Sequence, residues 1–264
     1  MFTVFLICLA LGAVVGFLAG LLGIGGGLII VPALLYLLPW VGVESQQLTH
    51  MAIATSLASI ILTSMSAASA HHKRANIPWP LFNTIMPGII LGALMAGFIS
   101  EQISSAALQQ VFAIFVILMA LQMAFPIKPQ AGRGLPSGQV LFGLSVVIAL
   151  LAGMMGIGGG VLMVPLLSYF GLAMRQAVGL SSATGFLIAL SGSLGYVVAG
   201  FDATHLPDYS LGYIYLPALL GIVITSMLAA PLGVKAASLW PTPVLKKLFA
   251  ILLVLVGIKL ISAG

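Results

Sequence analysis

Charged side chains are scarce in this chain, and their scarcity excludes an ordinary soluble domain. Only 5% of its 264 residues are charged, whereas a soluble globular domain carries about 25%. Apolar residues make up 61% of the chain, and the mean hydropathy is +1.26. This composition indicates a membrane protein, in which apolar helices of about 20 residues span the hydrocarbon core.

Acidic residues and cysteine are rarer still. The four acids lie between the apolar runs, so none is well inside a predicted membrane helix, where proton relays and cation sites usually place one. Cys8 is the only cysteine, which excludes a disulfide within the chain and a thiolate metal site. The apolar runs contain no His-Glu-x-x-His motif, paired carboxylates or Ser-His-Asp set. We therefore expect no enzyme activity, no metal site and no cofactor.

The long apolar runs predict an all-α, polytopic membrane protein. Two shorter runs, Gly27–Trp40 and Gly160–Phe170, each follow a cluster of glycines. The N-terminal run has no basic start and continues into a segment that recurs later, so we do not expect a cleaved signal peptide. The longer predicted helices are Phe2–Leu22, Leu48–Ala70, Pro78–Ser100, Ala106–Phe125, Gln139–Met155, Ala177–Gly200, Leu211–Pro231 and Val244–Ile261.

An internal repeat is the most informative pattern. Residues 20–36 read GLLGIGGGLIIVPALLY and residues 153–169 read GMMGIGGGVLMVPLLSY, with ten of seventeen positions identical. Two homologous halves are typical of transporters, which bind substrate where broken helices of the two halves meet. We divide the chain into a first transmembrane repeat (1–126), a cytoplasmic linker (127–137) and a second transmembrane repeat (138–264).

The placement of charge bears on the number of membrane segments in each repeat. If the short runs cross the membrane, giving five segments per repeat, eight of the nine Lys and Arg residues face one side. All four acids then face the other side with Lys259. If the short runs turn back, four segments cross per repeat and the basic residues divide between the two sides, against the positive-inside rule. We favour ten crossings, with eight as the alternative, and expect the basic loops in the cytoplasm. Because each repeat then has an odd number of segments, we expect the two repeats to be inverted.

Each repeat contains one glycine-broken helix. Three adjacent glycines disfavour continuous helix, because each costs about 1 kcal/mol relative to alanine. The helix that restarts presents unpaired N–H groups and the positive end of its dipole, which bind anions without a basic side chain. Alternatively, the glycines only let helices pack closely. We name residues 23–27 the first glycine break and residues 156–160 the second; their candidate substrate ligands are Gly23, Gly25, Gly26, Gly27, Gly156, Gly158, Gly159 and Gly160.

Hydroxyl side chains follow each glycine break at matching places. Thr55 and Ser56 in the first half, and Ser181 and Ser182 in the second, could complete the hydrogen bonds of an oxyanion. The alternative is that they bond to backbone carbonyls of their own helix. His50 could gate the site or carry a proton between pH 5 and 8; the alternative is a hydrogen-bonded histidine at the membrane interface.

These motifs match a known family. Gly-Ile-Gly-Gly-Gly, then Val-Pro, then Ala-x-Ala-Thr-Ser-Leu, with the set repeated, resembles the sulfite exporter TauE/SafE family over essentially the whole chain. The resemblance implies a polytopic inner-membrane carrier of small sulfur-containing anions such as sulfite, sulfonates or sulfoacetate. Family positions carry over onto Gly23–Gly27, Gly156–Gly160 and Thr55-Ser56. The second half departs from the pattern at Leu180-Ser181-Ser182.

We therefore expect a secondary carrier that exports small sulfur-containing or organic anions by alternating access between the two glycine-broken helices. Efflux of an anion from a cell that is negative inside is favoured by about 2.3 kcal/mol per charge per 100 mV. A passive anion channel with the same sites is the alternative, and a membrane-embedded binding protein is a third. The expected partners are a small anion and membrane lipid, with homo-oligomers left open. The scattered basic residues argue against nucleic acid.

Overall fold

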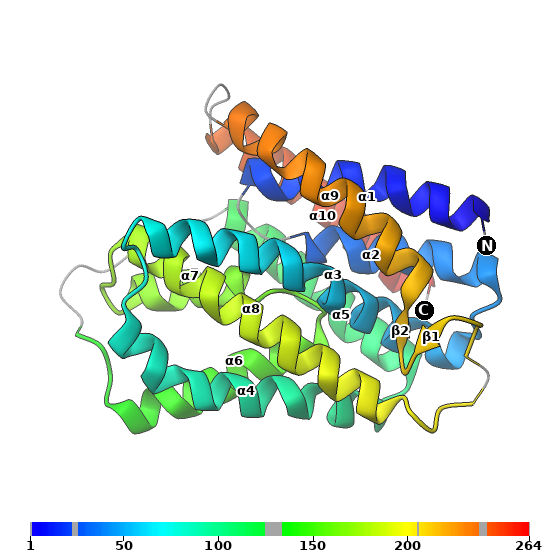
Figure 1. Ribbon diagram of the computed structural model, residues 1–264, viewed down its shortest axis with the longest axis horizontal. Coiled ribbons are helices and arrows are strands. Elements are labelled where there is room, and N and C mark those ends of the chain that lie inside the picture. Colours follow the sequence, from blue (N-terminus) through cyan, green and yellow to red (C-terminus); the bar gives the residue numbers. More distant parts are fainter. Residues whose placement is uncertain (1, 23–25, 125–133, 205, 238–241, 264) are drawn as a thin grey trace.

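The computed structural model describes residues 2–22, 26–124, 134–204, 206–237 and 242–263, which form a bundle of ten α-helices (Figure 1). A short 3-10 helix and one β-hairpin complete the described secondary structure. In chain order the elements are α1 (Phe2–Leu22), α2 (Gly27–Leu37), η1 (Leu38–Val41), α3 (Ser45–Lys73), α4 (Trp79–Glu101), α5 (Ser105–Ala124), α6 (Gly138–Met154), α7 (Gly160–Tyr169), α8 (Met174–Ala199), β1 (Ser210–Leu211), β2 (Ile214–Tyr215), α9 (Leu216–Ala237) and α10 (Thr242–Ala263).

The helices confirm the all-α, polytopic membrane class. Among the described residues, α3, α4, α5, α8 and residues 216–233 of α9 are long and apolar enough to cross a membrane. Five shorter apolar helices accompany them, including both short helices after the glycine breaks. The helices begin and end within a few residues of the predicted runs because long apolar segments, bounded by loops with Gly, Pro and charge, leave little choice of position.

One predicted boundary is wrong. The run from Leu211 was expected to be helical, but residues 210–215 form a hairpin and α9 begins only at Leu216. The strands pair antiparallel, with Leu211 opposite Ile214. Gly212 turns the chain with φ +53°, and a Cβ there would lie 2.5 Å from the carbonyl oxygen of Val197 in α8. The hairpin therefore fits tightly against the end of α8, a tertiary contact that overrides local hydrophobicity.

Helices of the two halves pair with each other in a reciprocal way. The first helix of each half packs against the fourth helix of the other half, as α1 with α9 and as α6 with α4. Glycines let both pairs approach closely: a Cβ at Gly12 would meet Ile222, and one at Gly88 would lie 2.7 Å from the Phe142 carbonyl oxygen. The third helices, α3 and α8, pack together, as do α5 and α10.

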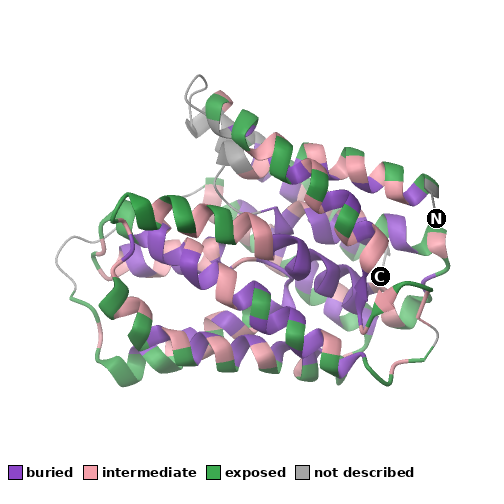
Figure 2. Cartoon of the chain, viewed as in Figure 1, coloured by how far each residue is buried: buried purple, intermediate pink, exposed green. Residues whose placement is uncertain are grey.

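The centre of the bundle is formed by α3 and α8, which lie between the α1–α9 pair and the α4–α6 pair (Figure 1). Every residue from Thr49 to Ile60 of α3 is buried, and buried residues concentrate in the middle of the bundle (Figure 2). The outer helices expose large apolar side chains such as Leu228 and Phe98, which is the pattern of helices that face lipid.

Charged residues separate toward the two ends of the bundle. Lys73 is the last residue of α3 and Arg74 follows it, Arg175 is the second residue of α8, and Lys235 and Lys247 lie near the end of α9 and the start of α10. These helix ends gather at one end of the bundle, here called the basic end (Figure 1). Glu44 precedes α3, Glu101 ends α4, Asp202 and Asp208 lie between α8 and the hairpin, and Lys259 lies near the end of α10. These segments lie at the opposite end of the bundle, here called the acidic end (Figure 1). Contacts between loops agree with this placement, because Arg74 and Arg175 line one pocket.

Candidate functional site

The second glycine break separates α6 from α7. The N–H of Ile157 bonds the carbonyl oxygen of Ala152 at 3.0 Å. The N–H of Gly156 donates to the carbonyl oxygen of Gly153 at 3.2 Å, which completes a Schellman motif. Gly156 holds the left-handed position of this motif with φ +65°, a conformation that costs other residues about 1–2 kcal/mol. Continuous helix therefore ends at Met154, as the glycine pattern predicted.

At the start of α7, several backbone N–H groups have no backbone acceptor in the described part of the chain. Gly159 precedes its first residue with φ +63°, and the N–H of Gly160 bonds back to the Gly158 carbonyl oxygen at 2.6 Å. Among the described residues, the N–H groups of Gly158, Gly159 and Val161 have no backbone acceptor. These donors lie at the positive end of the α7 dipole, where a negative charge is stabilised.

The first glycine break is described in part. Gly23 and Gly25 lie outside the described residues, whereas Gly26 and Gly27 are described and buried. Helix α1 ends at Leu22 and α2 begins at Gly27, so the described helices stop on either side of this break. The Gly26 carbonyl oxygen accepts the first bonds of α2, from Ile29 and Ile30, each at 3.0 Å.

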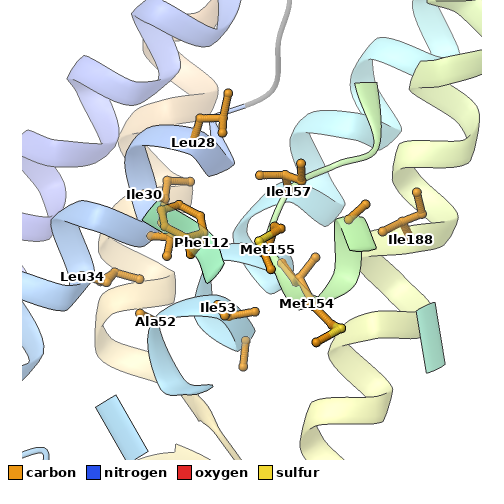
Figure 3. Close-up of a cluster of buried hydrophobic side chains, with 14 of the residues drawn as sticks. Leu28, Ile30, Leu34, Ala52, Ile53, Phe112, Met154, Met155, Ile157 and Ile188 are labelled. Carbon is orange, nitrogen blue, oxygen red and sulfur yellow. The ribbon is translucent and has the colours of Figure 1, made fainter. Parts of the chain in front are cut away.

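The two glycine breaks touch each other. A Cβ added to Gly27 would lie 2.5 Å from the Gly156 carbonyl oxygen and 3.0 Å from the Ile157 Cα. Gly158 in turn lies beside Ile60, which is near the midpoint of α3. The breaks are therefore neighbours at mid-depth in the bundle. Figure 3 shows Met155 and Ile157 of the second half among buried apolar side chains of α2 and α3.

The predicted hydroxyl side chains differ in what they contact: Thr55, Ser56 and Ser181 meet other segments, whereas Ser182 bonds its own helix. Ser56 donates a hydrogen bond of 2.8 Å to the Gly156 carbonyl oxygen, and Thr55 accepts one of 3.0 Å from the backbone N–H of Tyr215. The Oγ atom of Ser181 lies 3.3 Å from the position of a Cβ on Gly160, at the start of α7. Ser182 instead donates to the Val178 carbonyl oxygen of its own helix at 2.9 Å. The glycine breaks are therefore flanked by Ser56 and Ser181. Ser182 instead makes the alternative bond, to the backbone carbonyl four residues earlier in its own helix.

Further residues at the breaks carry no distinctive sequence pattern. Gly185 of α8 packs directly on the Gly158 carbonyl, and the Oγ of Ser64 lies 3.5 Å from the position of a Cβ at either glycine. The side chain of Ile188 covers Gly159, since a Cβ there would lie 2.5 Å from its Cδ1 atom. Only the crossing of α3 and α8 brings these residues to the second glycine break.

His50 lies nearer the acidic end, in a cluster of polar and aromatic side chains. Its Nε2 is 2.8 Å from the Ser100 carbonyl oxygen, and its ring stacks on Tyr213 with centroids 5.3 Å apart. Tyr196 donates a bond of 2.7 Å to the Ser100 hydroxyl. Burial, and secondly the carboxylate of Glu101, raise the pKa of Tyr213, so its phenol stays neutral. We name His50, Ser100, Tyr196 and Tyr213 the aromatic cluster.

The chemistry available at the breaks suits a small anion. The contacts made there come from backbone N–H and C=O groups, hydroxyls and apolar side chains, with no acid or base among them. Among the described residues, no group of three or more His, Cys, Asp or Glu could hold a metal ion. A negative ion can be bound by peptide dipoles alone, as helix N-termini bind phosphate and sulfate in other proteins.

Comparisons with known proteins agree with this picture. A family model described as "Sulfite exporter TauE/SafE" matches residues 8–260. A probable membrane transporter protein of Haemophilus influenzae is 41% identical over 263 residues, covering 98% of this chain and 99% of that protein. The probable membrane transporter protein YunE of Bacillus subtilis is 28% identical over 280 residues, covering 98% of each chain. No solved structure matches the chain.

Proposed function

Because this chain belongs to the sulfite exporter TauE/SafE family of membrane transporters, we propose that it is a secondary carrier that exports small sulfur-containing or organic anions. Sulfite is the substrate that the family's name suggests, and sulfonates carry the same kind of charged oxygen group. The carrier lies in the cell inner membrane with its basic end in the cytoplasm, in accordance with the positive-inside rule. Residues 1–126 and 138–264 are its two inverted repeats, and residues 127–137 are the linker.

The observation that carries this proposal is the contact between the two glycine breaks at mid-depth, where α7 begins with N–H groups that have no backbone acceptor among the described residues. The anion binds between the breaks and accepts hydrogen bonds from these groups and from nearby hydroxyls. Ser56 turns from the Gly156 carbonyl to the anion, and its stronger bond to a negative charge offsets the cost of leaving that carbonyl without its donor. The substrate ligands that we propose are Gly23, Gly25, Gly26, Gly27, Thr55, Ser56, Gly156, Gly158, Gly159, Gly160, Ser181 and Ser182.

Close packing at the breaks supports alternating access over a permanently open channel. Gly27 contacts Gly156 across the two halves, so the anion reaches the breaks only when the halves move apart. Ile188, which lies in the same half as Gly159 and covers it, must also turn its side chain away. The reciprocal pairing of α1 with α9 and of α6 with α4 supports inverted repeats, since a two-fold axis in the membrane plane exchanges these pairs. Rocking of one half against the other exposes the breaks to each side in turn.

His50 belongs to the gate at the acidic end. The aromatic cluster ties α3, α4, α8 and the hairpin together, because His50 and Tyr196 both bond Ser100 while Tyr213 stacks on His50. The hairpin also holds Thr55 through the N–H of Tyr215. Separation of these contacts opens a route from the acidic end to the breaks, and their closure blocks it.

Flux measurements in proteoliposomes test the proposal. Purified carrier should release radiolabelled sulfite or a sulfonate at a rate that saturates with concentration and rises as the potential favours anion movement. Unlabelled substrate on the opposite side should accelerate release by counter-flow, which a channel cannot do. Flux without saturation or counter-flow would identify a channel, and no flux for any sulfur-containing anion or carboxylate would contradict transport of this class.

A further inference from the structure

A second site lies at the basic end, between the α3–α4 loop of the first half and the start of α8 in the second half. It is a pocket of about 480 Å³. Its lining combines two guanidinium groups, an imidazole and an amide with two apolar side chains, and contains no acid. The lining residues are His71, Arg74, Asn76, Met174, Arg175 and Val178.

The two guanidinium groups lack a negative partner. Neither Arg74 nor Arg175 forms an ion pair in the part of the chain that the structure describes, and all four acids belong to segments of the acidic end. Two uncompensated cations in one pocket repel each other, so the pocket favours a ligand that carries negative charge. Arginine presents its N–H groups as a planar fork, which matches the oxygens of sulfate, sulfonate or phosphate.

The backbone holds the two arginines in place. After α3, the N–H groups of Ala75 and Asn76 bond the carbonyl oxygens of His72 and His71, each at 3.0 Å, and Ala75 adopts φ +53°. The resulting turn rests on α8, because a Cβ on Gly179 would lie 2.5 Å from the Asn76 carbonyl oxygen. This contact joins the loop that bears one arginine to the helix that bears the other.

The start of α8 adds backbone N–H donors to this pocket. Helix α8 has no side-chain cap at Ala173, and its first residues, Met174 and Arg175, line the pocket. The unpaired N–H groups and the positive dipole end of a long helix therefore reinforce the guanidinium groups. The lining of the pocket shares no residue with the glycine breaks. Val178 is its lining residue nearest to them, three residues before Ser181 in α8.

We propose that this pocket binds a polyatomic oxyanion of the sulfate or phosphate type through Arg74 and Arg175. The oxyanion is either a free ion or the phosphate of a lipid headgroup, since both present the same oxygens to the arginines. Occupancy bridges the α3–α4 loop to α8, and so links the two halves at the basic end. A purely topological role for the arginines predicts no saturable binding.

Equilibrium dialysis with radiolabelled sulfate tests the proposal on the full-length protein in dodecyl maltoside, at constant ionic strength set with sodium chloride. Sulfate should bind saturably, and phosphate should compete while chloride does not. The Arg74→Gln and Arg175→Gln variants should each weaken binding about tenfold or more. Lys247→Gln is the matched control, because it removes an exposed basic charge of the same end outside the pocket.

The source of the ligand is separated by repeating the titration in nanodiscs. Loss of sulfate binding when phosphatidylglycerol replaces phosphatidylcholine assigns the pocket to lipid phosphate, and unchanged binding assigns it to a free ion. Equal binding by the wild type and both arginine variants would overturn the proposal. Binding that survives both arginine changes but disappears in Ser56→Ala belongs to the glycine breaks, and would also overturn it while leaving the proposed transport function intact.

Discussion

Ser56 of α3 donates a hydrogen bond of 2.8 Å to the carbonyl oxygen of Gly156, one hundred residues further along the chain. This bond joins the two halves at the point where the second helix breaks. A buried carbonyl at a break needs a donor, because it has left the helical ladder and would otherwise be unpaired. Ser56 supplies that donor in the closed arrangement and can release it to a substrate.

Ser56→Ala should impair transport more than it impairs folding. Loss of the bond costs about 0.5–1.5 kcal/mol of stability and removes one proposed substrate donor, so we expect a higher KM for sulfite with a small fall in melting temperature. Ser145→Ala in α6 is the control, since Ser145 is not a proposed ligand and donates its bond of 2.7 Å to the Phe142 carbonyl oxygen of its own helix. Equal kinetic effects of the two changes would remove Ser56 from the site.

Gly27→Ala and Gly185→Ala should both destabilise the carrier. Each new methyl group would meet the backbone of the second glycine break, at Gly156 or Gly158, and overpacking of this kind costs about 1–3 kcal/mol. Unfolding in detergent measures the effect. Gly143→Ala in α6 is the control: a Cβ there meets nothing within 4 Å, so we expect a neutral change or a gain of up to about 1 kcal/mol.

Tyr196→Phe should loosen the gate at the acidic end. The change removes the 2.7 Å bond to Ser100 without changing the ring. The reporter is Met51→Cys, next to His50 and fully buried, in a Cys8→Ala background. Labelling by an impermeant maleimide added from the acidic end should accelerate. Tyr209→Phe, which alters an exposed phenol at the same end, should leave labelling unchanged; no acceleration in Tyr196→Phe would argue against the gate.

The side of the membrane that each end of the bundle faces can be measured by maleimide labelling of single cysteines in the same Cys8→Ala background. Lys73→Cys and Arg175→Cys should be labelled only in inverted vesicles, and Asp208→Cys only in intact cells, because ten segments place the basic end in the cytoplasm. All three positions are exposed. Labelling of Lys73→Cys and Arg175→Cys from opposite sides would instead support four crossings per repeat.

The helices and the positions of the breaks could be predicted from the sequence, because both depend on local composition. Long apolar runs fix the helices, and adjacent glycines such as Gly158–Gly160 interrupt them whatever the surroundings. The doubled pattern also predicted that the two breaks come together, and Gly27 does contact Gly156. Gly23 and Gly25 lie outside the described residues, so their place in the site stays a prediction.

Contacts between helices could not be predicted in this way. Nothing near Gly185 in the sequence indicates that it rests on Gly158, and nothing near Gly179 indicates that it holds Asn76. Both contacts exist because α8 crosses other segments at these glycines. The hairpin at Gly212 was missed for the same reason, since its run reads as apolar helix until its packing on Val197 is known.

The proposed transport mechanism depends most on anion binding by the start of α7, and the Gly159→Ala variant tests this binding most directly. Gly159 has φ +63°, so alanine costs about 1–2 kcal/mol there and displaces the N–H groups of the break. Sulfite binding and potential-driven flux should be measured for the wild type, Gly159→Ala and Gly143→Ala, each confirmed as folded. We predict that only Gly159→Ala loses both activities; full binding and flux in folded Gly159→Ala would contradict the site.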